Sequence, residues 1–309
     1  MTTPRYLLPY SPEEIGGLPE GFGAVLWDGV APPPEQAVLD GVEFFGVPYL
    51  RTAAAVPLLP RMPSLRVVQT LTAGVDDLLP HLPAGVAACN ARGLHDASTA
   101  ELAVALMLAS LRGIPDFVRR QETGEWRFGF HSALADRTVL IVGYGSIGEA
   151  LEARLRAFEC EVVRVARSAR EAPRGHVHAL DELPELLPVA DVVVLLVPLT
   201  GQSRGLAGAE FLARMKDGAL LVNVARGPVV DTKALLAELE SGRLCAALDV
   251  TDPEPLPADH PLWHAPGVLI SPHVGGASSA FLPRALRLLR SQLLLDLAGS
   301  PLVNVVATG

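Results

Sequence analysis

The run Thr138-Val-Leu-Ile-Val-Gly-Tyr-Gly-Ser-Ile-Gly148 determines how the rest of this chain is interpreted. Four of its first five residues are apolar, as in a buried parallel strand, and a helical apolar pattern follows over Glu149–Phe158. Between the two lies a GxGxxG motif. In such a motif the first glycine permits a tight turn, the second lets the backbone approach a pyrophosphate, and the third lets the helix pack closely on the strand. The run therefore predicts a dinucleotide-binding site at a helix N-terminus, where N–H groups favour an anion.

The motif supplies the first set of expected cofactor contacts, which are Gly143, Tyr144, Gly145, Ser146, Ile147 and Gly148. About 20 residues further on, NAD-binding sites place an Asp or Glu on the ribose hydroxyls. Here the chain reads Val165-Ala-Arg-Ser-Ala-Arg170, without a carboxylate. Arg167, Ser168 and Arg170 can hold a 2′-phosphate by charge-assisted hydrogen bonds, whereas a solvated basic turn is the alternative. We therefore expect NADP(H) to be preferred over NAD(H).

Further strand-like runs after the motif indicate a doubly wound parallel sheet. They cover Glu161–Val165, Asp191–Val197, Ala219–Val224, Cys245–Val250 and Val268–Ile270. Upstream, residues 1 to about 95 alternate short apolar runs with Pro and Gly, which predicts strands alternating with short helices. Two long helices are expected, over Ser98–Leu111 and Ala280–Leu297, and Val303–Val306 returns to an extended pattern.

Length, charge and composition exclude several classes of protein. The 309 residues suggest about two domains. A net charge of −9, without a long basic run, argues against a nucleic-acid partner. The longest apolar runs fall short of the ~20 residues needed to cross a bilayer, so no membrane contact is expected. Cys89, Cys160 and Cys245 form no CxxC pair, and the N-terminus shows no signal peptide, so we expect a cytoplasmic protein.

Three segments that follow predicted strands carry the polar residues of a candidate catalytic site. They are Asn223–Pro228, Leu248–Pro255 and Ser271–Gly276. Because the carboxyl ends of parallel strands line the cofactor crevice, we expect these segments to meet there. Together they offer one Arg, one Glu and one His, which suffice to move a hydride and a proton at a carbonyl. Taken singly, such residues are common on protein surfaces, and their joint placement after a nucleotide motif favours catalysis.

These segments also carry a resemblance to a known family. GYGSIG, Val197–Thr200 (VPLT), Asn223–Asp231 (NVARGPVVD), Ala247–Pro255 (ALDVTDPEP) and Ser271–Ser278 (SPHVGGAS) resemble the D-isomer-specific 2-hydroxyacid dehydrogenases in order and spacing. The resemblance covers nearly the whole chain, and it implies an α/β fold with two Rossmann-like, doubly wound parallel-sheet domains. The substrate domain would be discontinuous, with residues 1–97 and 281–309. Residues 98–280 would form the dinucleotide-binding domain.

The resemblance implies a role for each member of the triad. Arg226 would bind the substrate carboxylate and polarise the 2-keto oxygen, because a guanidinium stays charged and donates bidentately. His273 would be the general acid for reduction and the base for oxidation, since an imidazole titrates near neutral pH. Glu254 would accept a hydrogen bond from His273 and favour its imidazolium form.

Other contacts follow from the same resemblance. Thr72–Asp76 is similar to the family's substrate-carboxylate loop, so backbone N–H groups of Ala73, Gly74 and Val75 would complete the carboxylate pocket. Further cofactor contacts are expected at Pro198, Ala225 and Asp249, with Asp249 facing the nicotinamide edge. These positions lie outside the glycine-rich motif, so the predicted site draws on most of the chain.

Two pairs of histidines have spacings that could suit metal ligands. They are His176/His178, in a Pro/Gly-rich turn, and His260/His264, in a PADHPLWH loop. Neither pair has an accompanying cysteine cluster of the kind that structural zinc sites use. We therefore expect no metal site.

The sequence thus predicts an NADP(H)-dependent oxidoreductase that interconverts a small 2-keto acid and its D-2-hydroxyacid, similar to a glyoxylate or hydroxypyruvate reductase. The family resemblance also implies a homodimer. Glu254 argues against a formate dehydrogenase, in which a glutamine would be expected. A 3-phosphoglycerate-type dehydrogenase is an alternative, for which Arg51 is the obvious phosphate ligand in the first domain. The second alternative is a dinucleotide-sensing, corepressor-like protein without catalytic activity.

Overall fold

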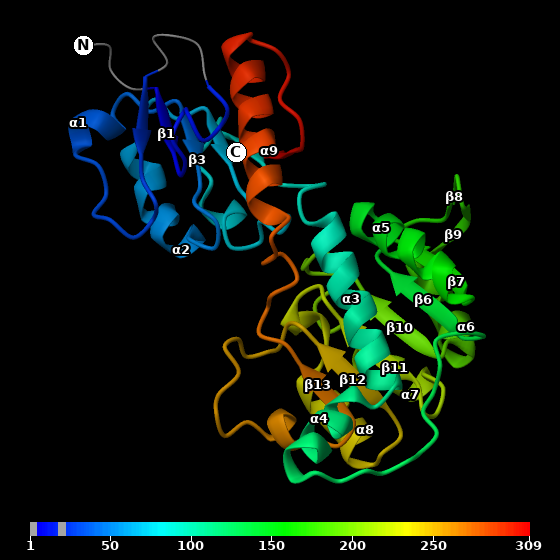
Figure 1. Ribbon diagram of the computed structural model, residues 1–309. Helices are drawn as coiled ribbons and strands as arrows, with labels where there is room; N and C mark the ends of the chain where they lie inside the picture. Colours follow the sequence, from blue (N-terminus) through cyan, green and yellow to red (C-terminus); the bar gives the residue numbers. More distant parts are fainter. Residues whose placement is uncertain (1–4, 18–22) are drawn as a thin grey trace. The chain divides into compact units, whose positions relative to one another are not determined.

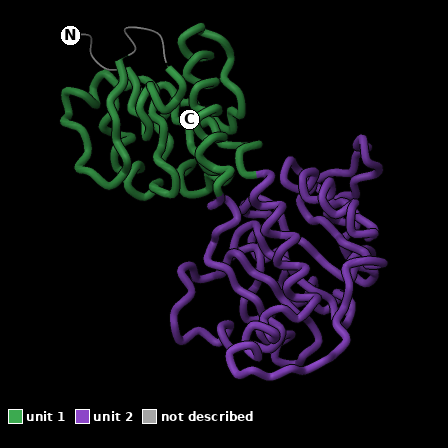
Figure 2. The backbone as a smooth tube through the Cα atoms, in the orientation of Figure 1, with its two compact units in different colours: residues 1–95, 279–309 green, residues 96–278 purple. Residues whose placement is uncertain are grey.

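The computed structural model describes residues 5–17 and 23–309, which separate into two compact units (Figure 2). Unit 1 comprises residues 1–95 and 279–309, and unit 2 comprises residues 96–278. Each border lies two residues from the one expected, at 95 against 97 and at 279 against 281. The first unit therefore contains segments from both ends of the chain.

Unit 1 contains a six-stranded sheet in the order β14-β5-β4-β3-β1-β2 (Figure 1). Its strands are β1 (Tyr6–Leu8), β2 (Ala24–Leu26), β3 (Phe44–Gly46), β4 (Val67–Gln69), β5 (Ala87–Cys89) and β14 (Val305–Thr308). In this sheet β14 runs antiparallel to β5, while the other pairs are parallel. β1, β3 and β4 are buried along their whole length, as expected for parallel strands covered on both faces.

Helix α9 (Phe281–Leu297) explains why the end of the chain belongs to unit 1. Ala285, Leu289 and Leu293 recur every four residues, which places them on one face, and all three are fully buried against residues of β1 and β3. The short helices of this unit are α1 (Gln36–Leu39), α2 (Thr52–Ala55), η1 (Val56–Arg61) and η2 (Leu79–His81). Together these helices and the sheet enclose the core of unit 1.

Unit 2 contains an eight-stranded sheet in the order β13-β12-β11-β10-β6-β7-β9-β8. Its strands are β6 (Thr138–Val142), β7 (Glu161–Ala166), β8 (Arg170–Ala172), β9 (Gly175–Ala179), β10 (Val192–Leu195), β11 (Leu220–Asn223), β12 (Cys245–Leu248) and β13 (Val268–Ile270). All neighbours are parallel except β8 and β9, which form an antiparallel hairpin at one edge. The chain order reverses between β6 and β10, and such a switch point is where α/β sheets bind ligands.

Helices cover the sheet of unit 2 (Figure 1). They are α3 (Asp96–Leu111), α4 (Ile114–Thr123), α5 (Ser146–Leu155), η3 (Arg156–Phe158), η4 (Leu180–Glu182), α6 (Leu183–Leu186), η5 (Leu187–Val189), α7 (Ala209–Arg214), η6 (Gly227–Val229), α8 (Thr232–Glu240) and η7 (Pro261–His264). Asp231 begins α8 as its N-cap, accepting from the backbone N–H groups of Lys233 and Ala234. Among the described residues, no single helix is long and apolar enough to cross a membrane. Within residues 5–17 and 23–309, α3 and α4 taken together, bent by 62°, pass that test on length and composition.

Candidate functional site

The GxGxxG loop connects β6 to α5 in unit 2. Gly143 has a φ of 109°, and a Cβ there would lie 2.5 Å from the carbonyl carbon of Leu196, so this turn requires glycine. A Cβ at Gly145 would meet nothing within 4 Å, which leaves space beside the backbone for a ligand. No side chain caps α5 at Gly145, so its first N–H groups can serve an anion. The loop therefore fits the pyrophosphate of a dinucleotide.

A buried ion pair fixes Tyr144, the second residue of this loop. The Tyr144 hydroxyl donates to the Glu152 carboxylate on α5, and Arg164 on β7 donates to the same carboxylate, with 3.0 Å between Arg164 Nε and Glu152 Oε2. Burial raises the pKa of Glu152, but the hydrogen bonds from Arg164 and Tyr144 outweigh it and hold that pKa below its usual value. The network thereby joins the loop, α5 and β7.

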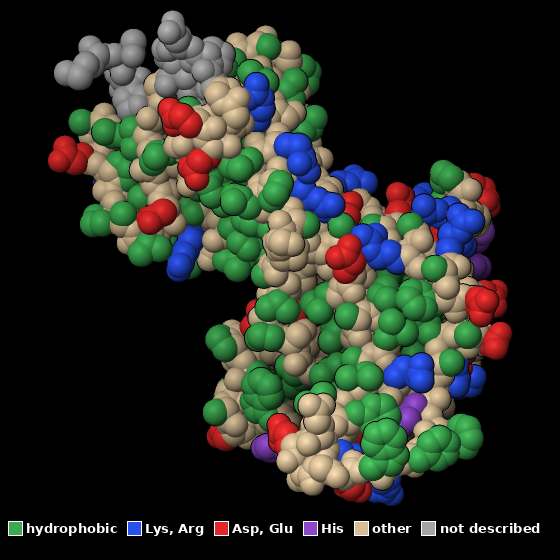
Figure 3. Space-filling model, viewed as in Figure 1, with side chains coloured by type: hydrophobic (Ala, Val, Ile, Leu, Met, Phe, Trp, Pro, Cys, Tyr) green, Lys and Arg blue, Asp and Glu red, His purple; other side chains and the backbone are tan. Residues whose placement is uncertain are grey.

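The basic residues predicted to bind a 2′-phosphate lie directly after β7. Arg167, Ser168 and Arg170 are all exposed, and no carboxylate lies among them. Arg170 begins β8, and its guanidinium donates to the Tyr144 carbonyl oxygen over 2.7 Å, which ties the hairpin to the glycine-rich loop. Figure 3 shows Lys and Arg side chains gathered over α5 and β8–β9. This end of unit 2 therefore presents positive charge beside the cofactor loop.

His273 and Glu254 form a hydrogen-bonded pair in unit 2. His273 Nδ1 lies 2.5 Å from Glu254 Oε1. This hydrogen bond raises the pKa of His273 above its usual value, although partial burial and the Arg226 charge oppose it. The His273 bond likewise lowers the pKa of Glu254, against its own burial. With Nδ1 engaged by the carboxylate, Nε2 is the ring nitrogen left to exchange a proton with a ligand.

Asp249 holds the loop that carries His273. Its carboxylate, 2% exposed, accepts from Ser271 Oγ at 2.6 Å, from Val274 N at 2.9 Å and from Gly275 N at 2.8 Å. Its backbone carbonyl accepts the N–H of His273 at 2.7 Å. The sequence predicts a cofactor contact for Asp249 and does not predict these bonds. Their one signal in the sequence is an Asp directly after a buried strand.

The loop that carries Arg226 follows β11 and packs directly on the segment before Glu254. Asn223 shapes it, since Asn223 Nδ2 donates to the Arg226 carbonyl oxygen at 2.9 Å and its Oδ1 accepts from Ala225 N at 3.0 Å. A Cβ on Gly227 would lie 1.8 Å from the Thr251 carbonyl oxygen, so the two backbones are in direct contact. This contact brings the Arg226 loop and the Glu254 loop together. The role of Asn223 has no signal in the sequence beyond its place at a strand end.

The remaining predicted contacts are divided between the two units. In unit 2, the Pro198 carbonyl oxygen accepts from Ser203 Oγ at 2.5 Å, and Ala225 is buried with its carbonyl oxygen bonded to the Arg226 guanidinium. In unit 1, the loop after β4 contains Ala73, Gly74 and Val75. Side chains of this unit hold that loop, because Thr72 Oγ1 donates to Gly74 O and Asn90 Nδ2 donates to Ala73 O, both at 2.8 Å.

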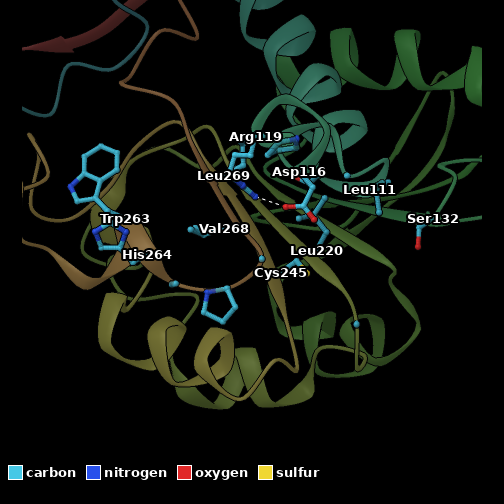
Figure 4. A pocket seen from close by; sticks show the side chains of 17 residues that line it. Leu111, Asp116, Arg119, Ser132, Leu220, Cys245, Trp263, His264, Val268 and Leu269 are labelled. Atoms are coloured by element: carbon cyan, nitrogen blue, oxygen red, sulfur yellow. Dashed lines mark hydrogen bonds and ion pairs between the residues drawn. The ribbon is translucent and has the colours of Figure 1, made fainter. Parts of the chain in front are cut away.

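A pocket of about 620 Å³ in unit 2 contains none of these residues (Figure 4). It lies at the amino-terminal ends of β11, β12 and β13. The loops of Arg226, Glu254 and His273 lie at the opposite, carboxyl ends of the same strands. Asp116 and Arg119 of α4 form an ion pair within it, 2.5 Å apart, and Cys245 and His264 line its wall. The pocket is therefore separate from the candidate active site.

Comparison with known proteins assigns the chain to a family. The model of the D-isomer specific 2-hydroxyacid dehydrogenase NAD-binding domain matches residues 104–275. The chain belongs to the D-isomer-specific 2-hydroxyacid dehydrogenases. A glyoxylate/hydroxypyruvate reductase B from Escherichia fergusonii is 38% identical over 237 residues, which cover 72% of this chain and 71% of that protein. The family resemblance inferred from the motifs is thereby confirmed.

Solved structures of the family have the same fold. A D-isomer specific 2-hydroxyacid dehydrogenase family protein from Aeromonas salmonicida aligns with a TM-score of 0.86 at 29% identity, over 99% of both chains. An NADPH-dependent glyoxylate/hydroxypyruvate reductase from Sinorhizobium meliloti, solved with NADP and sulfate, aligns with a TM-score of 0.84 at 28% identity, again over 99% of both chains. The predicted Rossmann-type α/β fold is confirmed, and this dehydrogenase is an NAD(P)-dependent oxidoreductase.

Proposed function

We propose that this dehydrogenase is an NADP(H)-dependent reductase that converts a small 2-keto acid, such as glyoxylate or hydroxypyruvate, into its D-2-hydroxyacid. The observation that carries the proposal is the grouping of Arg226, Glu254 and His273 on three loops at the carboxyl ends of adjacent strands, in the unit that holds the GxGxxG loop. The relatives named glyoxylate/hydroxypyruvate reductase support the same substrate class.

The geometry supports a role for each side chain. NADPH, when bound, supplies the hydride that reduces the carbonyl carbon. Arg226 binds the carboxylate of the keto acid and polarises the 2-keto oxygen. A guanidinium suits both tasks, because it stays charged and can donate two parallel hydrogen bonds. His273 holds a proton at Nε2 and delivers it to that oxygen as the hydroxyl forms. Glu254 positions the imidazole through Nδ1 and stabilises the protonated ring before transfer. Reduction thus uses one hydride and one proton.

We infer a preference for NADP(H) over NAD(H) from the turn after β7. NAD-binding sites have a carboxylate at this place, which binds the ribose hydroxyls and would repel a 2′-phosphate. This chain instead has two cations and a hydroxyl there, from Arg167, Ser168 and Arg170. The bond from Arg170 to the Tyr144 carbonyl oxygen holds this turn beside the glycine-rich loop. The NADP bound to the Sinorhizobium meliloti reductase is consistent with this preference.

Three further assignments belong to the proposal. Unit 2 is the cofactor domain and unit 1 the substrate domain, in which the N–H groups of Ala73, Gly74 and Val75 bind the substrate carboxylate. The enzyme acts as a homodimer, which is supported by three exposed aromatic side chains of unit 2 at positions 126, 128 and 130. It works in the cytoplasm, a reducing compartment that suits the free thiols of its three cysteines.

Steady-state kinetics with four substrates and two cofactors test the function directly. Glyoxylate, hydroxypyruvate, pyruvate and phenylpyruvate are each assayed with NADPH and with NADH. We expect the highest kcat/KM with glyoxylate or hydroxypyruvate and NADPH. Substitution of Arg167 by Ala should lower kcat/KM for NADPH at least about tenfold and leave that for NADH nearly unchanged, since a charge-assisted bond to the 2′-phosphate contributes ~1.5–3 kcal/mol. Tight NADPH binding without turnover of any substrate would contradict the proposal.

A further inference from the structure

The hairpin at the edge of unit 2 brings together three side chains that the proposed reductase activity does not use. His176 and His178 lie two residues apart on β9, and alternate residues of a strand project from the same face. Glu182 ends the 3₁₀ turn η4 that follows this strand. Side-chain ligand atoms of the three residues lie within 4.8 Å of one another. The sequence led us to expect no metal at the histidine pair, because Glu182 joins the pair only through the turn after β9.

The surroundings of the histidines resemble those of metal ligands. His176 Nδ1 bonds to Glu171 Oε1 at 2.8 Å, across the hairpin from β8. A histidine whose Nδ1 is held by a carboxylate has its Nε2 directed outward, which is the usual arrangement of a ligating imidazole. His178 Nδ1 and Glu182 Oε2 are 2.7 Å apart, and the rings of His176 and His178 lie 4.8 Å apart. Nitrogen and oxygen donors therefore converge on one small volume.

We propose that His176, His178 and Glu182 form a binding site for a divalent transition-metal ion of the zinc class. Two imidazoles and one carboxylate are a ligand set that Zn²⁺ accepts, with remaining positions filled by water. Bonds of about 2.0–2.2 Å place tetrahedral ligand atoms about 3.4 Å apart. The partly exposed side chains reach that spacing by rotation about their χ angles, while β9 keeps its place between β7 and β8.

The position of the site sets what the metal would do. β9 pairs with β7 at Val165, and the Val165 carbonyl oxygen accepts the N–H groups of Gly143 and Tyr144. Figure 3 shows histidine side chains at this β8–β9 edge, beside the basic group. A bound ion ties β9 to η4 and leaves the triad and the glycine-rich loop untouched. The site is therefore distinct from the proposed catalytic groups.

Titration of the untagged, full-length enzyme with Zn²⁺ alone tests the proposal. After treatment with a chelator and removal of it, isothermal titration calorimetry and equilibrium dialysis should show one saturable ion per chain. The double variant His176→Ala/His178→Ala should bind Zn²⁺ at least about tenfold more weakly, and Glu182→Gln should weaken binding as well. Circular dichroism checks that each variant keeps the fold.

A second double variant, His81→Ala/His264→Ala, removes two exposed histidines from other parts of the chain. It should bind Zn²⁺ like the unsubstituted enzyme. Equal loss of affinity in both double variants, or Zn²⁺ binding that survives His176→Ala/His178→Ala, would overturn the assignment. Because the titration contains neither cofactor nor substrate, its result does not depend on the proposed reductase activity.

Discussion

His273 adopts a left-handed backbone conformation, with a φ of 52°, which few residues other than glycine favour. Two contacts impose it, since the His273 N–H bonds to the Asp249 carbonyl oxygen and Nδ1 bonds to Glu254. Non-glycine residues in this region recur at functional sites, where the surrounding structure holds them. The sequence predicts the presence of the His and the Glu from their motifs. The backbone conformation depends on the buried Asp249, whose role only the structure displays.

Glu254→Gln should change the pH dependence of reduction. The carboxylate stabilises the imidazolium, so its loss lowers the pKa of His273, and the protonated form that the proposed mechanism uses for reduction disappears at a lower pH. We expect kcat/KM with NADPH and glyoxylate to fall at least about tenfold at pH 7.5, and the alkaline decline of its pH profile to begin at a lower pH. His273→Ala in the same assay should remove that decline. An unchanged profile in Glu254→Gln would show that the pair does not set the titration.

Gly227→Ala should destabilise the enzyme, because the added Cβ would lie 1.8 Å from the Thr251 carbonyl oxygen and must push two loops apart. Overpacking of this kind costs about 1–3 kcal/mol of the free energy of unfolding. Gly201→Ala is the matched control, since a Cβ there meets nothing within 4 Å. Urea unfolding followed by circular dichroism measures both variants, and equal midpoints would contradict the tight contact.

Apolar runs predict the central strands of unit 2 well, because both faces of a parallel strand are buried and its sequence is therefore a continuous apolar run. The predicted strand over Thr138–Val142 has the same bounds in the structure. The hairpin of β8 and β9 was not predicted, since Arg170–Ala172 is polar, short and exposed at a sheet edge. β1 (Tyr6–Leu8) was also not predicted.

The pairing of α5 with β7 leads to a prediction about acid stability. Glu152→Gln leaves the partly buried Arg164 without its carboxylate, which should cost about 2–4 kcal/mol of the free energy of unfolding at pH 7. The pKa of Glu152 is lower in the folded enzyme, so its contribution is complete above the unfolded-state pKa and disappears as the pH falls through the folded-state pKa. The difference between the two proteins should therefore shrink in acid.

Melting temperatures of Glu152→Gln and of the unsubstituted enzyme, measured from pH 7 to pH 3, test this sign. Glu149→Gln, one turn earlier on α5 and exposed, is the control and should change the melting temperature little. A destabilisation by Glu152→Gln that grows in acid would contradict the lowered pKa. A variant as stable as the parent at pH 7 would show that the buried pair contributes nothing net.

The length of 309 residues predicts about two units, and the family resemblance predicts that the C-terminal segment completes the first of them. The return of the C-terminal segment to unit 1 rests on Ala285, Leu289 and Leu293, whose spacing predicts a buried helix face but does not say against which sheet. That partner follows from the fold. What covers the exposed aromatic residues after α4 likewise cannot be derived from periodicity, since the segment has none.

The exposed segment after α4 should be part of a dimer interface. Trp126, Phe128 and Phe130 are 98%, 81% and 96% exposed, and hydrophobic side chains lie at the surface beside α4 in Figure 3. Each aromatic ring can bury about 150–250 Å², so the three supply much of the ~800 Å² per partner of a stable interface. Sedimentation equilibrium at micromolar concentration should give a dimer, and Phe128→Ser/Phe130→Ser should shift it toward monomer. Val189→Ser removes another exposed apolar side chain of unit 2 and should leave the dimer intact, whereas a monomeric parent enzyme would contradict the prediction.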